Sequence, residues 1–218
     1  MKNIFQIYGT ESNPVYILRD INLEVSEVEF VSIMGPSGSG KSSLLYLIGM
    51  LERPTSGEYY FDEKATHELK DRDLSDLHSG QVGFVFQQYH LIDEMTVYEN
   101  LETPLLYKKL KRRERDVIVC DMLDRFSIVS KRALFPNQLS GGHQQLVGIA
   151  RALITEPKLI LADEPTGNLH SEQGQEIMEL FSKLNREGTT ILQVTHSDLN
   201  ASFGNRTLEL LDGRIVSG

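Results

Sequence analysis

One short segment near the N-terminus largely sets the type of fold. The apolar stretch FVSIM (30–34) leads directly into GPSGSGKS, and a second apolar stretch, SLLYLIGML (43–51), follows. The glycine-rich part fits the pattern G-x-x-x-x-G-K-[S/T] between a strand and a helix, where glycines let backbone N–H groups converge on a phosphate. Lys41 then neutralises phosphate oxygens and the Ser42 hydroxyl ligates Mg²⁺. The predicted phosphate-binding residues are Gly35, Pro36, Ser37, Gly38, Ser39, Gly40, Lys41, Ser42 and Ser43.

Apolar patterns along the rest of the chain predict strands alternating with helices. Strands are expected at 3–8, 21–25, 30–34, 57–61, 82–86, 158–163 and 189–196, with a hairpin at 208–216. Helices are expected at 43–51, stopped by Pro54, within 96–130, from the glycines at 141–142 to just before Pro157, and around 177–184, capped by Gly188. This is an α/β fold: a P-loop NTPase core with a mostly parallel sheet, an N-terminal antiparallel β subdomain and an inserted α-helical subdomain. We expect one domain, 1–218, with its helical subdomain at approximately 90–145.

Four polar side chains follow predicted strands at the edge where such a sheet delivers its ligands. Asp163 is predicted to hold Mg²⁺, mostly through water, and Glu164 to activate the attacking water as general base. Gln87 is predicted to sense the water and Mg²⁺, and His196 to donate to the terminal phosphate. The alternatives are that Glu164 caps a turn and that Gln87 and His196 are ordinary turn residues.

An aromatic ring is expected to stack on the nucleotide base. Three candidates lie near the N-terminus: Tyr8, Phe5 and Tyr16. Core packing is the commoner use of such rings, so the residues alone leave the choice open.

Charge and composition exclude several classes of function. Lysine and arginine number 22 against 31 acidic residues, a net charge of −9 that argues against a nucleic-acid partner. The single cysteine, Cys120, provides neither a disulfide nor a metal cluster. With no long apolar run and no secretory signal at the start, we expect the protein to stay in the cytoplasm. The basic residues between Lys108 and Arg115 are interpreted as a solvated helix start rather than a lipid or partner contact.

The sequence LSGGHQQL (139–146) opens a second glycine-rich helix. Ser140, Gly141 and Gly142 offer phosphate-binding donors at a helix N-terminus, yet the first loop already surrounds one side of the nucleotide. A head-to-tail dimer resolves this, because the helix of each chain then closes over the γ-phosphate held by the other. An ordinary serine-glycine helix cap is the alternative.

The set GPSGSGKS, FQQ, LSGGHQQ, LILADEP and THS, in this order, resembles the nucleotide-binding subunit of ABC transporters. EFVSIMGPSGSGKS, VGFVFQQYHLI, NQLSGG and LADEPTGNL look most like the branch of lipoprotein-release, macrolide-export and cell-division ATPases. The resemblance implies an ATP hydrolase with ATP and Mg²⁺ as cofactors, in which Ser42, Gln87 and Asp163 hold the metal. Glu164, His196 and Gln87 would act in catalysis, and Tyr8 falls at the family's adenine-stacking position.

The resemblance also implies partners and a location. The subunit would form a homodimer on ATP binding and sit peripherally on the inner face of the cell membrane. A membrane permease would dock on the region from Gln87 through the helical subdomain. A periplasmic or envelope partner would be connected to the subunit through that permease. The alternative function is force or signal transmission across the membrane without transport. A chromosome-organising or DNA-repair ATPase is disfavoured, because too few residues separate Lys41 from Leu139 for a long coiled-coil insertion.

Five positions depart from the family pattern. His143 stands where the signature helix usually has glutamine or glutamate, and Leu146 where it has arginine. His170 replaces an aspartate in the loop after the catalytic glutamate. Val28 stands where a turn glycine is usual, and Gly148 where alanine is common. The His170 change puts coupling between the two sites in doubt more than binding.

Overall fold

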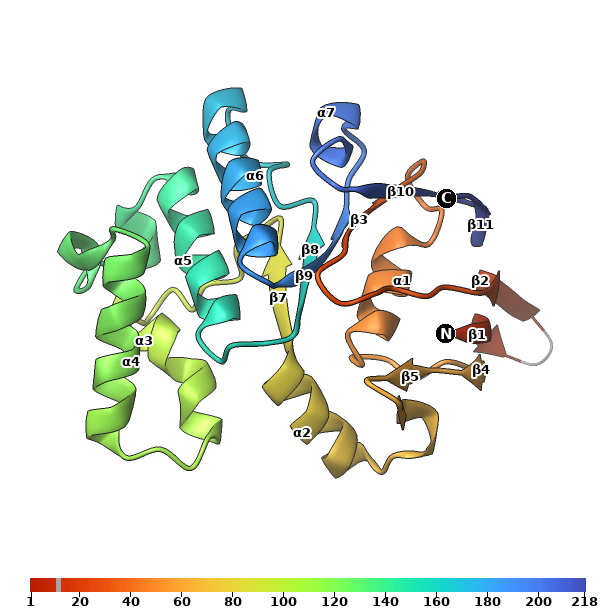
Figure 1. Ribbon diagram of the computed structural model, residues 1–218, viewed down its shortest axis with the longest axis horizontal. Coiled ribbons are helices and arrows are strands. Elements are labelled where there is room, and N and C mark those ends of the chain that lie inside the picture. The colour runs from red at the N-terminus through yellow and green to blue at the C-terminus, as the bar shows by residue number, and fades with distance from the viewer. Residues whose placement is uncertain (11–12) are drawn as a thin grey trace.

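A six-stranded sheet forms the centre of the molecule (Figure 1). The computed structural model describes residues 1–10 and 13–218. The strand order is β11–β10–β3–β9–β8–β7, all parallel except for β11. The strands are β3 (Phe30–Met34), β7 (Val82–Phe86), β8 (Leu159–Asp163), β9 (Thr190–Val194), β10 (Arg206–Leu211) and β11 (Arg214–Ser217).

Smaller elements lie at the two ends of this sheet (Figure 1). Antiparallel strands form one end: β1 (Lys2–Thr10), β2 (Asn13–Ile21) and β4 (Ser56–Glu58), with the pair β5 (Tyr60–Phe61) and β6 (Lys64–Ala65) nearby. Helices form the other end: α3 (Val97–Glu102), α4 (Arg112–Arg125) and α5 (Gly141–Leu153). The predicted α/β fold is confirmed, with its mostly parallel sheet, N-terminal antiparallel β subdomain and helical subdomain, and β11 makes the main sheet a mixed one.

The remaining helices complete the layers. They are α1 (Lys41–Ile48), α2 (Asp71–Gln81), α6 (Ser171–Arg186) and α7 (Asp198–Ala201), with short 3₁₀ helices at η1 (Thr66–Glu68), η2 (Thr103–Tyr107), η3 (Val129–Lys131) and η4 (Pro136–Gln138). None of the helices in the described parts of the chain is long and apolar enough to span a bilayer.

The sheet is apolar on both faces because helices cover both of them. Along β8, Leu159 and Leu161 belong to an apolar cluster that includes α1, whereas Ile160 and Ala162 belong to a second cluster that includes α5 and α6. A strand buried on both sides must be apolar throughout, as LILA is. This fixes the carboxyl ends of the parallel strands as the edge where polar side chains emerge.

Several predicted boundaries are wrong. Residues 22–25 form no strand: the second strand is Asn13–Ile21, and beyond it Leu23 exchanges two backbone hydrogen bonds with Met1. The first helix ends at Ile48, before Pro54, because Gly49 caps it and Met50 turns to a left-handed φ of 60°. The segment 57–61 is divided between two short strands, and α2 was not anticipated.

Candidate active site

The phosphate loop joins β3 to α1, as predicted. Two of its glycines cannot be replaced without a clash: Gly35 has φ +152° and Gly40 has φ +101°. A Cβ atom on Gly35 would lie 2.1 Å from the Leu210 carbonyl oxygen, and one on Gly40 would lie 2.8 Å from that of Ile17. The Lys41 ammonium reaches back over the loop and donates to the carbonyl oxygens of Gly35 (2.8 Å) and Pro36 (2.9 Å). The loop thus curls around its own lysine at the start of a helix, the geometry that receives phosphate oxygens.

Ser42 and Asp163 meet across the gap between α1 and β8. The Ser42 hydroxyl donates to the Asp163 carboxylate over 3.3 Å. Burial is the main cause that raises the pKa of Asp163 above its ordinary value, and the negative charge of Glu164 adds to this effect. The hydrogen bond from Ser42 and the positive charge of Lys41 act in the opposite direction. A hydroxyl and a carboxylate are the hard oxygen donors that Mg²⁺ takes in combination with phosphate oxygens and water. No cluster of three or more His, Cys, Asp or Glu side chains in the described ranges could hold a metal by itself. The pair therefore fits a metal that arrives with a nucleotide.

Glu164 and His196 form the next pair along the sheet edge. The Glu164 carboxylate contacts the His196 Nδ1 at 2.8 Å, with the glutamate largely shielded and the histidine ring exposed. Glu164 has a left-handed φ of 47°, an uncommon conformation for a residue with a side chain that tends to mark functional sites. β9 ends at Val194, so His196 follows the strand by two residues rather than ending it. The Glu164 carboxylate is therefore held by the loop after β9.

Gln87 follows β7, but its amide is bound to the loop after Glu164. Its Nε2 donates to the Asn168 side-chain oxygen over 3.3 Å, and the Asn168 amide donates to the Gln87 carbonyl oxygen over 2.9 Å. In this arrangement Gln87 is hydrogen-bonded to Asn168, in the loop that follows the general-base candidate Glu164, rather than to Ser42 or Asp163.

The signature residues are Ser140, Gly141 and Gly142, and they lie at the start of α5. The side chains that contact them do not come from the phosphate loop. Ser140 is the N-cap, and its side-chain hydrogen bonds stay within the first helical turn, to His143. A Cβ atom on Gly141 would meet Tyr89 and Leu169, and one on Gly142 would meet Gln173. The structure therefore does not bring this helix start to the phosphate loop of its own chain.

Tyr8 projects from β1 beside the start of α1. Its hydroxyl donates to the Glu52 carboxylate, and this bond is the main cause of the raised pKa of Tyr8. Ser43, in the first turn of α1, also contacts the hydroxyl. The Arg19 guanidinium lies 5.3 Å from the ring centroid of the rival Tyr16.

Two polar side chains that sequence reasoning missed, the half-buried Arg151 and the buried Gln145, connect these loops to α5. Arg151 donates to the carbonyl oxygens of His90 (2.7 Å) and Tyr89 (3.1 Å), just after Gln87. Gln145 donates to the Pro165 carbonyl oxygen over 2.7 Å, next to Glu164. A polar residue among the apolar residues of a helix is the sequence signal that could have identified these side chains, because a buried polar group needs a hydrogen-bond partner. Which carbonyl oxygens serve as partners depends on the tertiary structure.

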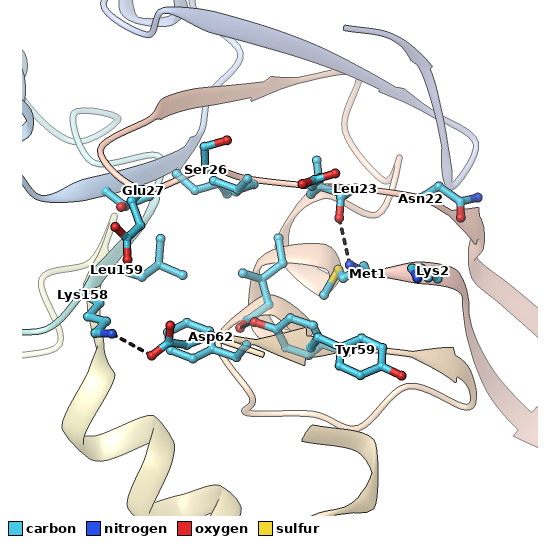
Figure 2. A pocket seen from close by; sticks show the side chains of 17 residues that line it. Met1, Lys2, Asn22, Leu23, Ser26, Glu27, Tyr59, Asp62, Lys158 and Leu159 are labelled. Atoms are coloured by element: carbon cyan, nitrogen blue, oxygen red, sulfur yellow. Dashed lines mark hydrogen bonds and ion pairs between the residues drawn. The ribbon is translucent and has the colours of Figure 1, made fainter. Parts of the chain in front are cut away.

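A separate cavity of about 860 Å³ lies away from all of these residues (Figure 2). Its wall includes Tyr59, Leu159 and the ion pair between Lys158 and Asp62. Lys158 precedes β8, so the cavity lies at the amino ends of the parallel strands, opposite Asp163. None of the predicted site residues lines it.

Comparisons with known proteins agree with this geometry. The ABC transporter family profile matches residues 18–167. The uncharacterized ABC transporter ATP-binding protein YvrO of Bacillus subtilis is 43% identical over 99% of this chain and 94% of its own length. The macrolide export ATP-binding/permease protein MacB of Aggregatibacter actinomycetemcomitans is 43% identical over the whole chain, which spans 34% of that protein.

A solved structure extends the comparison to three dimensions. The dimeric, post-hydrolysis ATP-binding cassette MJ0796, bound to ADP and Pi, superimposes with a TM-score of 0.90 at 44% identity, covering 99% of this chain and 95% of that one. A sequence relative of that name, an uncharacterized ABC transporter ATP-binding protein from Methanocaldococcus jannaschii, is 45% identical over 99% of this chain and 94% of its own length. This chain therefore belongs to the ABC transporter family and is an ATP-hydrolysing cassette of that family.

Proposed function

We propose that this cassette powers a membrane permease through ATP-driven dimerisation. The observation that carries the proposal is the separation between the Ser140 helix start and the phosphate loop in one chain, which leaves each half-site without the other. A second copy placed head to tail supplies the missing half, and MJ0796, to which this chain is similar, is dimeric in solved structures. Because ATP contacts both copies only in the closed dimer, its binding favours that state over the open one.

Within each half-site the residues take distinct roles. Lys41 and the loop amides bind the phosphates, Tyr8 stacks on the adenine, and Ser42 and Asp163 hold Mg²⁺. The metal, when bound, neutralises charge on the phosphate oxygens. Glu164 accepts a proton from the attacking water, and His196 orients this carboxylate through its Nδ1 contact. In the closed dimer the Gln87 side chain would leave Asn168 and turn toward the metal. Gln87 therefore binds Asn168 in the single chain and would bind the metal in the dimer, but not both at once.

The helical subdomain, at approximately 90–145 of a single functional unit 1–218, is the proposed permease-docking region. Leu106, Tyr107, Val117 and Val129 are exposed there, at 55%, 83%, 58% and 52% of their surface. Arg151 ties the loop after Gln87 to α5, whose first residue follows Ser140. A displacement imposed by a permease on that loop is therefore transmitted to the helix that closes over ATP. We therefore propose that the subunit sits peripherally on the inner face of the cell membrane.

The dimer is tested with the Glu164→Gln variant. Removing the general base while retaining an acceptor for His196 should stop turnover and trap the ATP-bound state. We expect a stable dimer in Mg²⁺–ATP by analytical ultracentrifugation and an ATPase rate lowered by at least 10²-fold. Glu164→Gln combined with Ser140→Arg, which blocks the helix start, is the matched control and should remain monomeric. A Glu164→Gln protein that stays monomeric in saturating ATP would show that the closed dimer is wrong.

The permease is tested by affinity purification from membranes, followed by reconstitution of the pair in vesicles. Transport driven by ATP supports the proposal, and the match to an ATP-binding/permease protein makes an export permease the first candidate. ATPase stimulation by an envelope partner without flux of a substrate would instead support the force-transmitting alternative.

A further inference from the structure

The side chain at the fifth position of LSGGH contacts the signature serine. The His143 Nδ1 lies 2.7 Å from the Ser140 Oγ, a strong hydrogen-bond distance. The backbone N–H of His143 approaches the same oxygen at 3.4 Å, the longer contact of the helix cap. His143 is half-buried in the first turn of α5, so its ring is held close to the hydroxyl that the proposed dimer presents to the partner's nucleotide.

The position of one proton decides what this contact does. A serine hydroxyl has one proton to donate, and a neutral imidazole ring has one donor nitrogen and one acceptor nitrogen. If the Nδ1 is unprotonated, the Ser140 hydroxyl donates to the ring and its proton is directed away from any phosphate. If the Nδ1 carries a proton, the ring donates to Oγ, and the hydroxyl proton is free to face an incoming phosphate.

We propose that His143 is a positioning residue whose imidazolium form donates from Nδ1 to the Ser140 Oγ and so directs the serine hydroxyl toward the terminal phosphate bound by the partner chain. The inference rests on the proposed ATP dimer. The protonated ring adds a positive charge at the start of α5, where the helix dipole already favours an anion. Closing the dimer therefore takes up a proton at His143.

The surrounding charges set the direction of the pH effect. In the single chain, burial and then the charge of Lys131 in η3 lower the pKa of His143 below its ordinary value. Tyr89 from the loop after β7 and Gln173 from α6 lie against the adjacent glycines and are uncharged near neutral pH. The partner's triphosphate stabilises the cation and raises the pKa of His143 in the dimer. Dimerisation accordingly tightens as pH falls through the raised pKa, and levels off below the lowered one.

The experiment measures the dimer dissociation constant of Glu164→Gln in saturating Mg²⁺–ATP from pH 8 to pH 5.5. Two further changes are compared in that background. His143→Asn keeps an amide donor for Ser140 without titrating, and His143→Leu removes the donor. Every other titratable group, on the protein and on ATP, is common to all three proteins, so the difference between the profiles isolates His143. We expect the His143 protein to tighten, relative to His143→Asn, by up to about a hundredfold per pH unit, because each of the two chains takes up one proton.

His143→Leu is expected to be weaker than His143→Asn at every pH, with a profile parallel to it. Titration calorimetry in two buffers of different ionisation enthalpy should show proton uptake that His143→Asn loses. Parallel pH profiles for His143 and His143→Asn would overturn this inference while leaving the ATP dimer intact. Absence of a dimer for Glu164→Gln at every pH would overturn the dimer itself, and this inference with it.

Discussion

At the scale of single residues, Asp163 illustrates a conflict between folding and metal binding. Burial raises the pKa of this carboxylate in the folded chain, so the group favours folding below its unfolded pKa, and this contribution is lost as pH rises through the folded pKa. Asp163→Asn keeps an acceptor for the Ser42 hydroxyl without the buried charge. We expect it to unfold at higher urea than the parent at pH 7.5, without ATP or Mg²⁺, and to lose ATPase activity. The stability gain should shrink toward pH 5, and equal stability at pH 7.5 would contradict the argument.

At the scale of elements, α5 contains an internal glycine that it does not need for packing. A Cβ on Gly148 would meet only the Tyr89 carbonyl oxygen, at an ordinary 3.5 Å, so Gly148→Ala should raise the free energy of unfolding by about 1 kcal/mol through higher helix propensity. Gly83 on β7 is the matched control, because its Cβ would lie 2.4 Å from the Ala152 carbonyl oxygen. Gly83→Ala should destabilise in the same urea titration. A Gly148→Ala protein that is less stable than the parent would indicate that the loop after β7 packs too tightly on α5 to accept an added methyl group.

At the scale of the whole molecule, His170 lies where the family usually has an aspartate that couples the two sites of the dimer. It is the N-cap of α6 and makes no capping hydrogen bond with its side chain. We expect His170→Asp to leave the ATPase rate unchanged or to raise it, as measured by phosphate release at saturating ATP. His170→Asn, which also caps a helix but carries no charge, separates a gain in helix stability from a gain in coupling. A clear fall in rate with aspartate would show that His170 is a tuned replacement.

Local sequence was sufficient wherever backbone geometry and side-chain chemistry coincide in one short segment. The loop from Gly35 to Ser42 requires glycines for its left-handed turns, and the strand ending at Asp163 requires continuous apolar residues. The unusual residue Val28 follows the same logic, since its φ of +61° is the conformation for which a glycine is usual. The wrong strand at 21–25 shows the limit. Alternation of apolar residues predicts a buried face but not a pairing partner, and β1 pairs with Asn13–Ile21 instead.

The sequence by itself determined the phosphate loop, the buried strands β3, β7, β8 and β9, and the residue types at the edge of the sheet, because each depends on neighbours within a few positions. Only the tertiary structure decided that Gln87 binds Asn168, that Arg151 holds the loop after β7, and that Tyr89, Leu169 and Gln173 lie against the glycines that follow Ser140. These contacts join residues far apart in the chain. Their partners are set by how helices pack on the two faces of the sheet, which no local pattern encodes.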